Sequence, residues 1–144
     1  MNSLDTNILI YASNRAAPEH DKAIEVVHAM LANPSDWIIA DQVLWEFYKA
    51  LRHPLILSKP RTACQAASQV RFLREEGGVA CCAYEIRQFS AVLARLEDPK
   101  NPYQRTHDVV LGETLRGNGV TAFYTHNTKD FADSGFTHLI DPIT

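Results

Sequence analysis

Short apolar runs alternate along the chain with longer segments in which apolar residues recur at helical spacing. The apolar runs predict short buried strands at residues 3–4, 37–40, 79–82, 120–125 and 137–142. The periodic segments predict helices that begin at residue 6 and that cover residues 20–31, 42–52, 62–75, 86–96 and 106–116. Strands and helices in alternation predict an α/β fold whose mostly parallel sheet is covered on both faces. The order of the strands cannot be predicted from this pattern.

Composition narrows the class of protein. At 144 residues, with 46% hydrophobic and 22% charged residues, the chain is typical of a globular protein and predicts one domain, residues 1–144. A net charge of -3 means that any nucleic-acid binding depends on a local cationic patch. The cysteines have no C-x-x-C spacing, so neither a disulfide framework nor a thiolate zinc site is indicated. No signal peptide or membrane span is apparent, and we expect a cytoplasmic protein that does not enter a membrane.

Asp5 stands where the first predicted strand ends and the first helix begins. Ligands of open α/β sheets bind beyond the carboxyl ends of the strands, so a carboxylate at this point suits a functional site. Taken alone, Asp5 is more simply explained as the N-cap of the helix. The functional interpretation gains weight because polar oxygen groups recur at three later strand ends or helix starts.

Those later positions are Glu46, Asp108, and Asn127 with Asp130 close by. Glu46 lies at the edge of the apolar stripe of its helix, where a solvated glutamate is the simpler explanation. Asp108 lies in the first turn of the helix predicted from residue 106, where it also suits the helix dipole. Thr106 would then be the cap of that helix.

Carboxylates that converge on one point repel each other and bind protons more tightly. A hard divalent cation removes that cost, and oxygen ligands without a thiolate suit Mg²⁺ or Mn²⁺ better than zinc. Such an ion lowers the pKa of a bound water and neutralises charge on a phosphate under attack. These positions therefore favour a metal-dependent phosphodiesterase.

The sequence resembles the PIN-domain ribonucleases, in particular the VapC-type toxins of bacterial toxin–antitoxin pairs, over nearly its whole length. The resemblance rests on residues 4–12 (LDTNILIYA), 43–47 (VLWEF), 107–112 (HDVVLG), 123–131 (FYTHNTKDF) and 141–142 (DP). It implies a Rossmann-like three-layer sandwich with a mostly parallel central sheet. It also implies an endoribonuclease that depends on Mg²⁺ or Mn²⁺ and cleaves RNA with a metal-activated water. An antitoxin partner and a homodimer are implied as well.

By motif, the resemblance implies that Asp5, Glu46 and Asp108 are catalytic, metal-binding acids. Thr6 and Thr125 correspond to supporting hydroxyls.

Asn7 matches the usual residue two positions after the first acid. Asn127 stands at a further catalytic position where many relatives have Asp, and an uncharged amide would hold a second metal more weakly. Asp130 either replaces Asn127 or caps the segment before Phe131.

Cations close in sequence to these acids are candidates for phosphate contacts, although each is also explained as a solvated surface charge. They are Arg15, Lys49, Arg52, Arg105 and Lys129. For His107 and His126 we expect hydrogen bonds within loops rather than proton transfer. Four aromatic residues are expected in the core or in a groove for a partner helix, rather than as base-stacking platforms. They are Trp37, Trp45, Phe47 and Tyr48.

Two other functions remain open at this point. An aspartyl-nucleophile phosphatase also places an Asp after its first strand, but it commonly needs a second Asp where this chain has Asn7. A PIN-like binding module with a decayed site would explain Asn127, although the three acids that remain argue against decay.

Overall fold

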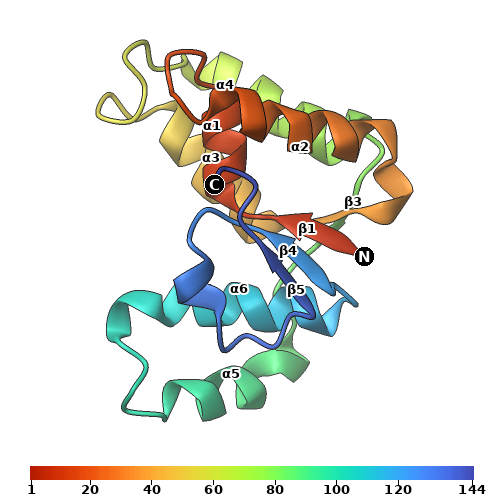
Figure 1. Ribbon diagram of the computed structural model, residues 1–144, viewed down its shortest axis with the longest axis vertical. Coiled ribbons are helices and arrows are strands. Elements are labelled where there is room, and N and C mark those ends of the chain that lie inside the picture. The colour runs from red at the N-terminus through yellow and green to blue at the C-terminus, as the bar shows by residue number, and fades with distance from the viewer.

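A parallel β-sheet separates two groups of helices in the computed structural model, which describes residues 1–144 (Figure 1). Its strands are β1 (Asn2–Leu4), β2 (Ile38–Ala40), β3 (Ala80–Cys82), β4 (Ala122–Tyr124) and β5 (His138–Ile140). β4 lies between β1 and β5, β2 pairs with β3, and all these pairs are parallel. A parallel bridge from Asn2 to Trp37 joins the two parts, which gives the order β3-β2-β1-β4-β5. The predicted α/β class is confirmed.

Helices cover both faces of the sheet (Figure 1). One group comprises α1 (Thr6–Ala12), α2 (His20–Ala32), α3 (Asp41–Leu51) and α4 (Ala63–Arg71). The other comprises α5 (Phe89–Leu96) and α6 (Thr106–Gly117). The helix expected over 62–75 is α4 continued by a π-helical turn, Phe72–Glu76, and the one expected over 86–96 starts with a 3-10 turn, Ile86–Gln88. Further 3-10 turns are Pro34–Asp36, Tyr103–Arg105 and Thr128–Phe131.

The hydrophobic core lies between the sheet and the helices. Leu4, Ile39 and Phe123 of the central strands are fully buried in one cluster that includes Ile8 of α1. Burying a side chain of this size contributes about 1.5–3 kcal/mol, so these contacts stabilise the packing of α1 against the sheet. No helix is both long and apolar enough to cross a lipid bilayer.

Two local expectations need correction. Thr106 is not the cap of α6: the 3-10 turn Tyr103–Arg105 precedes it, and its hydroxyl donates to the Tyr103 carbonyl at 2.7 Å. Trp37 and Phe47 are buried as expected, whereas Trp45 is 69% exposed, which excludes the core and leaves the groove as the remaining expectation for it.

Candidate active site

The carboxyl ends of three strands lie at one edge of the sheet because the strands are parallel. The residues that directly follow β1, β2 and β4 are Asp5, Asp41 and Thr125. The backbone N–H of Asp5 still donates to the carbonyl of Tyr124 at 2.9 Å, so the β1–β4 pairing extends to the acid. This pairing brings residues from the two ends of the chain together.

Asp5 is buried, and both of its carboxylate oxygens accept hydrogen bonds. The backbone N–H of Thr6 donates to one oxygen at 2.7 Å, and the hydroxyl of Thr125 donates to the other at 2.7 Å. Burial raises the pKa of Asp5, these two bonds oppose the rise, and the charges of Glu46 and Asp130 add to it. Asp5 is thus the N-cap of α1 and also a buried acid at the edge of the sheet.

Glu46 is exposed on α3, yet its carboxylate is held from two sides. The hydroxyl of Thr6 donates to it at 2.9 Å, and the side-chain amide of Gln42 donates to it at 3.2 Å. The same Gln42 amide donates to the His107 carbonyl at 3.0 Å. These bonds connect α3 to the start of α1 and to the start of α6.

Asp108 lies in the first turn of α6 and is partly buried. Burial raises its pKa to about 6, and the negative charges of Asp5, Asp130 and Glu46 contribute, while Arg105 opposes the rise. A carboxyl group whose pKa is raised by its acidic neighbours shares a region with them.

The carboxylates do not stand at mutual ligand spacing: no group of three or more Asp, Glu, His or Cys side chains is close enough to hold an ion. The donor set nevertheless fits a hard divalent cation, because it consists of carboxylates and hydroxyls without a thiolate. The raised pKa values of Asp5 and Asp108 show that their charged forms are disfavoured, and a bound cation would favour those charged forms.

Asn127 and Asp130 occupy different environments. Asn127 is exposed, and its backbone N–H donates to the Thr125 hydroxyl at 3.0 Å. Asp130 lies inside the 3-10 turn Thr128–Phe131 and forms an ion pair with Arg105 at 3.4 Å. Asp130 therefore does not cap the segment before Phe131, which corrects that expectation. Its negative charge contributes to the raised pKa values of Asp5 and Asp108.

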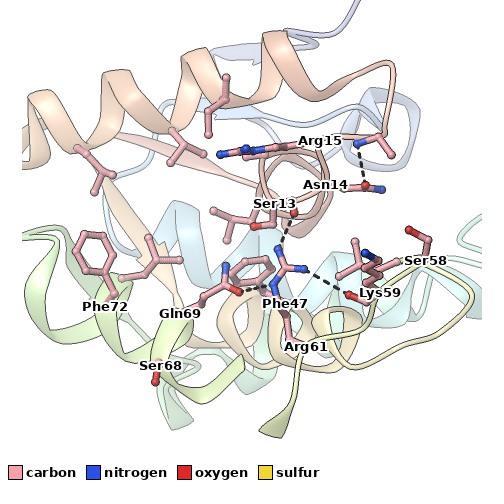
Figure 2. A pocket seen from close by; sticks show the side chains of 18 residues that line it. Ser13, Asn14, Arg15, Phe47, Ser58, Lys59, Arg61, Ser68, Gln69 and Phe72 are labelled. Atoms are coloured by element: carbon pink, nitrogen blue, oxygen red, sulfur yellow. Dashed lines mark hydrogen bonds between the residues drawn. The ribbon is translucent and has the colours of Figure 1, made fainter. Parts of the chain in front are cut away.

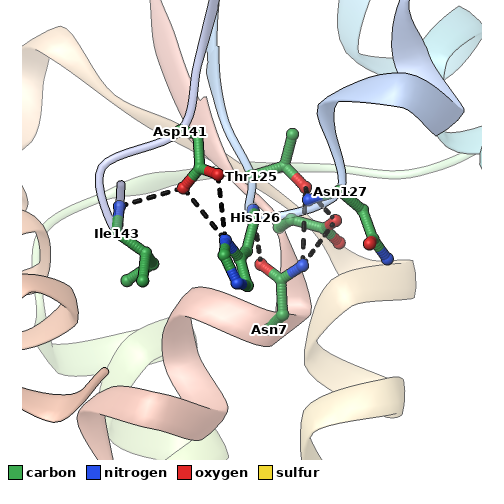
Figure 3. Close-up of polar contacts among 7 residues, drawn as sticks. Asn7, Thr125, His126, Asn127, Asp141 and Ile143 are labelled. Carbon is green, nitrogen blue, oxygen red and sulfur yellow. Dashed lines mark hydrogen bonds and ion pairs between the residues drawn. The ribbon is translucent and has the colours of Figure 1, made fainter. Parts of the chain in front are cut away.

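Three residues that the sequence singled out separately, Asn7, Thr125 and His126, form one polar network with Asp5 (Figure 3). The side-chain amide of Asn7 donates to the Thr125 hydroxyl at 3.4 Å and to the Asp5 carboxylate at 3.5 Å, and its oxygen accepts the His126 N–H at 3.3 Å. The His126 ring nitrogen Nδ1 lies 2.9 Å from the carboxylate of Asp141. The expected loop hydrogen bond of His126 is confirmed, but its acceptor is a residue of the C-terminal tail.

Asp141 itself has a lowered pKa. Burial acts in the opposite direction, but the Ile143 backbone N–H and His126 both favour the charged carboxylate. The only sequence signal for this pair was the presence of Asp141 in the final motif, which carries no information on its partner.

The candidate cations are not gathered at one place. Arg105 lies next to the acids through its ion pair with Asp130, and the guanidinium of Arg52 donates to the Tyr48 hydroxyl at 3.2 Å. Lys49 and Lys129 are exposed. Arg15 lines a separate cavity and takes no part in the acidic site.

That cavity, of about 700 Å³, lies among α1, α2, α3 and α4 (Figure 2). Its walls include the apolar side chains of Leu9, Ile24, Val27, Phe47, Leu57 and Phe72. Arg15, Lys59 and Arg61 add positive charge to its lining. The Arg61 guanidinium donates to the Ser13 carbonyl at 3.0 Å and to the Gln69 side chain at 3.1 Å, so it links α1 to α4.

The chain is similar to known proteins in sequence and in fold. Ribonuclease VapC24 of Mycobacterium tuberculosis is 35% identical over 144 residues, which are 100% of this chain and 98% of that protein. Ribonuclease VapC48 of the same organism is 26% identical over 143 residues, 99% of this chain and 97% of the relative. The crystal structure of M. tuberculosis VapC20, a sarcin–ricin loop cleaving toxin, matches with a TM-score of 0.69 at 16% identity, covering 96% of this chain and 98% of that one. No family model matches the chain.

Proposed function

The chain belongs to the VapC family of PIN-domain ribonucleases, and on that premise we propose that its acidic site holds Mg²⁺ or Mn²⁺ and cleaves RNA. Asp5, Glu46 and Asp108 are the proposed metal-binding acids. The observation that carries the proposal is geometric: Thr6 donates its backbone N–H to Asp5 and its hydroxyl to Glu46, so these two acids meet at one residue. The third acid, Asp108, has a pKa that is raised to about 6, first by burial and then by the negative charges of Asp5, Asp130 and Glu46. Such mutual repulsion is what a cation site relieves.

A divalent ion bound there would lower the pKa of a water and neutralise charge on the phosphate. Hydrogen bonds within the chain fix the orientation of the acids that would hold such an ion. Thr125 and the Thr6 N–H fix the two oxygens of Asp5, while the Thr6 hydroxyl and Gln42 fix Glu46. Thr6 therefore acts on both acids and is proposed as a positioning residue, together with Asn7 behind Asp5.

Asn127 adds only an uncharged oxygen to this set, and Asp130 already has Arg105 as its partner. We therefore expect one strongly held ion. Arg105 and Lys129 are the proposed phosphate contacts nearest the acids, with Lys49 and Arg52 further along α3. Arg15 is not proposed as a phosphate contact because it lines the separate cavity.

Cleavage of an RNA panel with Mn²⁺ present tests the proposal. We expect wild type to cut, and Asp5→Asn and Asp108→Asn to lose activity while their circular dichroism spectra stay unchanged. Asp21→Asn is the matched control, because Asp21 is an exposed acid at the start of α2. Wild-type rates equal to those of the Asp5 and Asp108 variants would refute the proposal. Calorimetric titration with Mn²⁺ distinguishes a decayed binding module, which would show no binding that depends on Asp5.

The phosphatase alternative has little support in the structure. The residue two positions after Asp5 is an amide that is already bonded to Asp5 and Thr125, and an amide cannot act as a general acid.

Family membership also supports an antitoxin partner and a homodimer. The cavity beside Arg15 and Arg61 has the apolar walls and positive charge that an amphipathic acidic segment of an antitoxin requires. The homodimer contact could use an exposed apolar stripe on α5 and on the 3-10 turn before it. The stripe consists of Ile86, Phe89 and Leu93, which are 90%, 59% and 45% exposed.

Expression in bacteria tests the antitoxin proposal. We expect growth arrest that co-expression of the neighbouring small gene relieves. Arg15→Glu should leave the arrest intact and abolish the rescue, since it reverses charge in the cavity and not at the acids. Rescue that is equally effective for Arg15→Glu would contradict this docking site.

A further inference from the structure

Trp45 is exposed directly beside a proposed catalytic acid. It is 69% exposed, whereas the other tryptophan, Trp37, is 5% exposed. Because consecutive residues of a helix point about 100° apart, Trp45 and Glu46 leave α3 on neighbouring faces. A large aromatic ring that is exposed to water lacks the burial that usually stabilises it, so a ligand that covers the indole would supply that burial.

The Trp45 side chain lines a cavity of about 390 Å³ between α3 and the α4 segment. The other lining residues are Tyr48, Ala67, Val70, Arg71, Arg74 and Glu75. The cavity is within the range of about 300–1,000 Å³ that is typical of small-ligand sites. It combines two aromatic rings with two guanidinium groups.

An ion pair places this cavity at the catalytic edge of the sheet. The Arg74 guanidinium lies 3.1 Å from the carboxylate of Asp41, the residue that directly follows β2. Asp5 follows β1 and Thr125 follows β4 at the same edge. The cavity therefore lies on α3 close to the edge of the sheet that carries the acids.

The cations of the cavity remain accessible. Arg71 is 4.0 Å from Glu75, and the two side chains are 58% and 64% exposed. The Arg74 side chain is 51% exposed although it pairs with Asp41. Exposed pairs of this kind are weak, so a phosphate can compete for these guanidinium groups. Both guanidinium groups are paired with carboxylates, so the cavity offers donors to a phosphate without being a net cationic patch.

We propose that the Trp45 cavity binds one unpaired nucleotide of the RNA substrate, next to the cleaved bond. The base stacks on the Trp45 indole, and Arg71 and Arg74 contact the flanking phosphates. Aromatic platforms beside cations are how proteins hold single-stranded RNA. This proposal rests on the ribonuclease function, and it revises the expectation that Trp45 is not a base-stacking platform.

Fluorescence of the full-length Asp5→Asn variant, which should bind RNA without cutting it, tests the contact. An unstructured oligoribonucleotide should quench the emission, and removal of Trp45 by substitution with Phe should abolish the quenching because Trp37 is buried. In otherwise wild-type protein, Trp45→Ala should raise KM about tenfold, the usual scale for one stacked base. Trp45→Phe should retain most of the affinity, and Arg71→Gln should weaken binding without touching the aromatic ring.

The outcomes separate the two proposals. If wild type cuts RNA while Trp45→Ala and Arg71→Gln retain its KM, the nucleotide site is wrong and the ribonuclease proposal stands. If wild type is as inactive as the Asp5 variant, the ribonuclease proposal fails first. A second copy of the chain is the other candidate to cover the cavity, and light scattering tests it. If Trp45→Ala changes the protein from a dimer to a monomer, the cavity is an interface between copies and the nucleotide site is wrong.

Discussion

The hydroxyl of Thr125 donates a 2.7 Å hydrogen bond to the carboxylate of Asp5, across 120 positions of sequence. Both residues are buried. The parallel pairing of β1 with β4 places them side by side, since each follows the end of its strand. The same hydroxyl accepts the backbone N–H of Asn127, so Thr125 connects the buried acid to the loop after β4.

Replacing this hydroxyl with a methyl group in Thr125→Val should weaken both the fold and the site. The buried Asp5 carboxylate loses a donor that lowers its pKa, so its pKa should rise further. Leaving such a group without its partner costs about 1–3 kcal/mol of unfolding free energy. Urea denaturation and Mn²⁺-dependent cleavage measure the two effects. Thr125→Ser keeps the hydroxyl and should stay close to wild type, and an equal loss in both variants would contradict the role of the bond.

The raised pKa of Asp108 predicts a pH dependence for the metal-free protein. The folded value of about 6 exceeds the ordinary value of 3.8, so between these values the folded state holds a proton that the unfolded chain has released. Protonated Asp108 therefore adds to the unfolding free energy. This contribution is fully present below about pH 4 and is lost as the pH rises through about 6.

Asp108→Asn removes this contribution. The unfolding free energy of the variant, compared with that of wild type, should therefore increase by about 1 kcal/mol as the pH is raised from about 4 to about 7. The value is kept small because Asp108 is only partly buried and solvent screens its charge. Denaturation in EDTA across that range measures the difference. For wild type, Mn²⁺ should reverse the trend, because an ion favours the charged carboxylate. A difference between the proteins that does not change with pH would count against the coupling.

The pKa of Asp141 is shifted in the opposite direction, so its charged carboxylate should stabilise the protein at neutral pH. Its lowered pKa means that its contribution is present above the ordinary carboxyl range and is lost as the pH falls through the folded value. Asp141→Asn should release the His126 ring and cost about 1 kcal/mol, the scale of a partly exposed charge-assisted bond. Thermal unfolding at pH 7 measures the loss. His126→Gln provides the partner variant, and the double variant should lose little more than either alone.

The sequence predicted the parts of the site that depend on local pattern. Asp5 could be placed because the change from an apolar run to helical spacing marks a strand end, and parallel strands share a carboxyl edge. Glu46 was ambiguous because one turn of helix does not fix which neighbour a side chain meets, and the structure connects it to the Asp5 turn through Thr6.

Other features depend on contacts that no local pattern encodes. The strand order β3-β2-β1-β4-β5 is set by packing across the sheet, and the pairing of Asp130 with Arg105 follows from where the loop before α6 lies. For Trp45 the sequence left both the core and a groove open, because helical periodicity cannot distinguish a core face from a face that borders a cavity.

Asn127 provides a test of how many ions the site holds. Its side chain is exposed after β4, so Asn127→Asp would add a carboxylate near acids whose pKa values are already raised. Without metal, the extra charge should raise the pKa of Asp108 further and lower stability at neutral pH. With metal, an added charged ligand should tighten Mn²⁺ binding by about tenfold or create a second, weaker site. Calorimetry measures affinity and stoichiometry together, with Asn127→Ala as the control for loss of the amide. Unchanged Mn²⁺ binding in the Asp variant would mean that residue 127 lies outside the metal site and that Asp5, Glu46 and Asp108 define it.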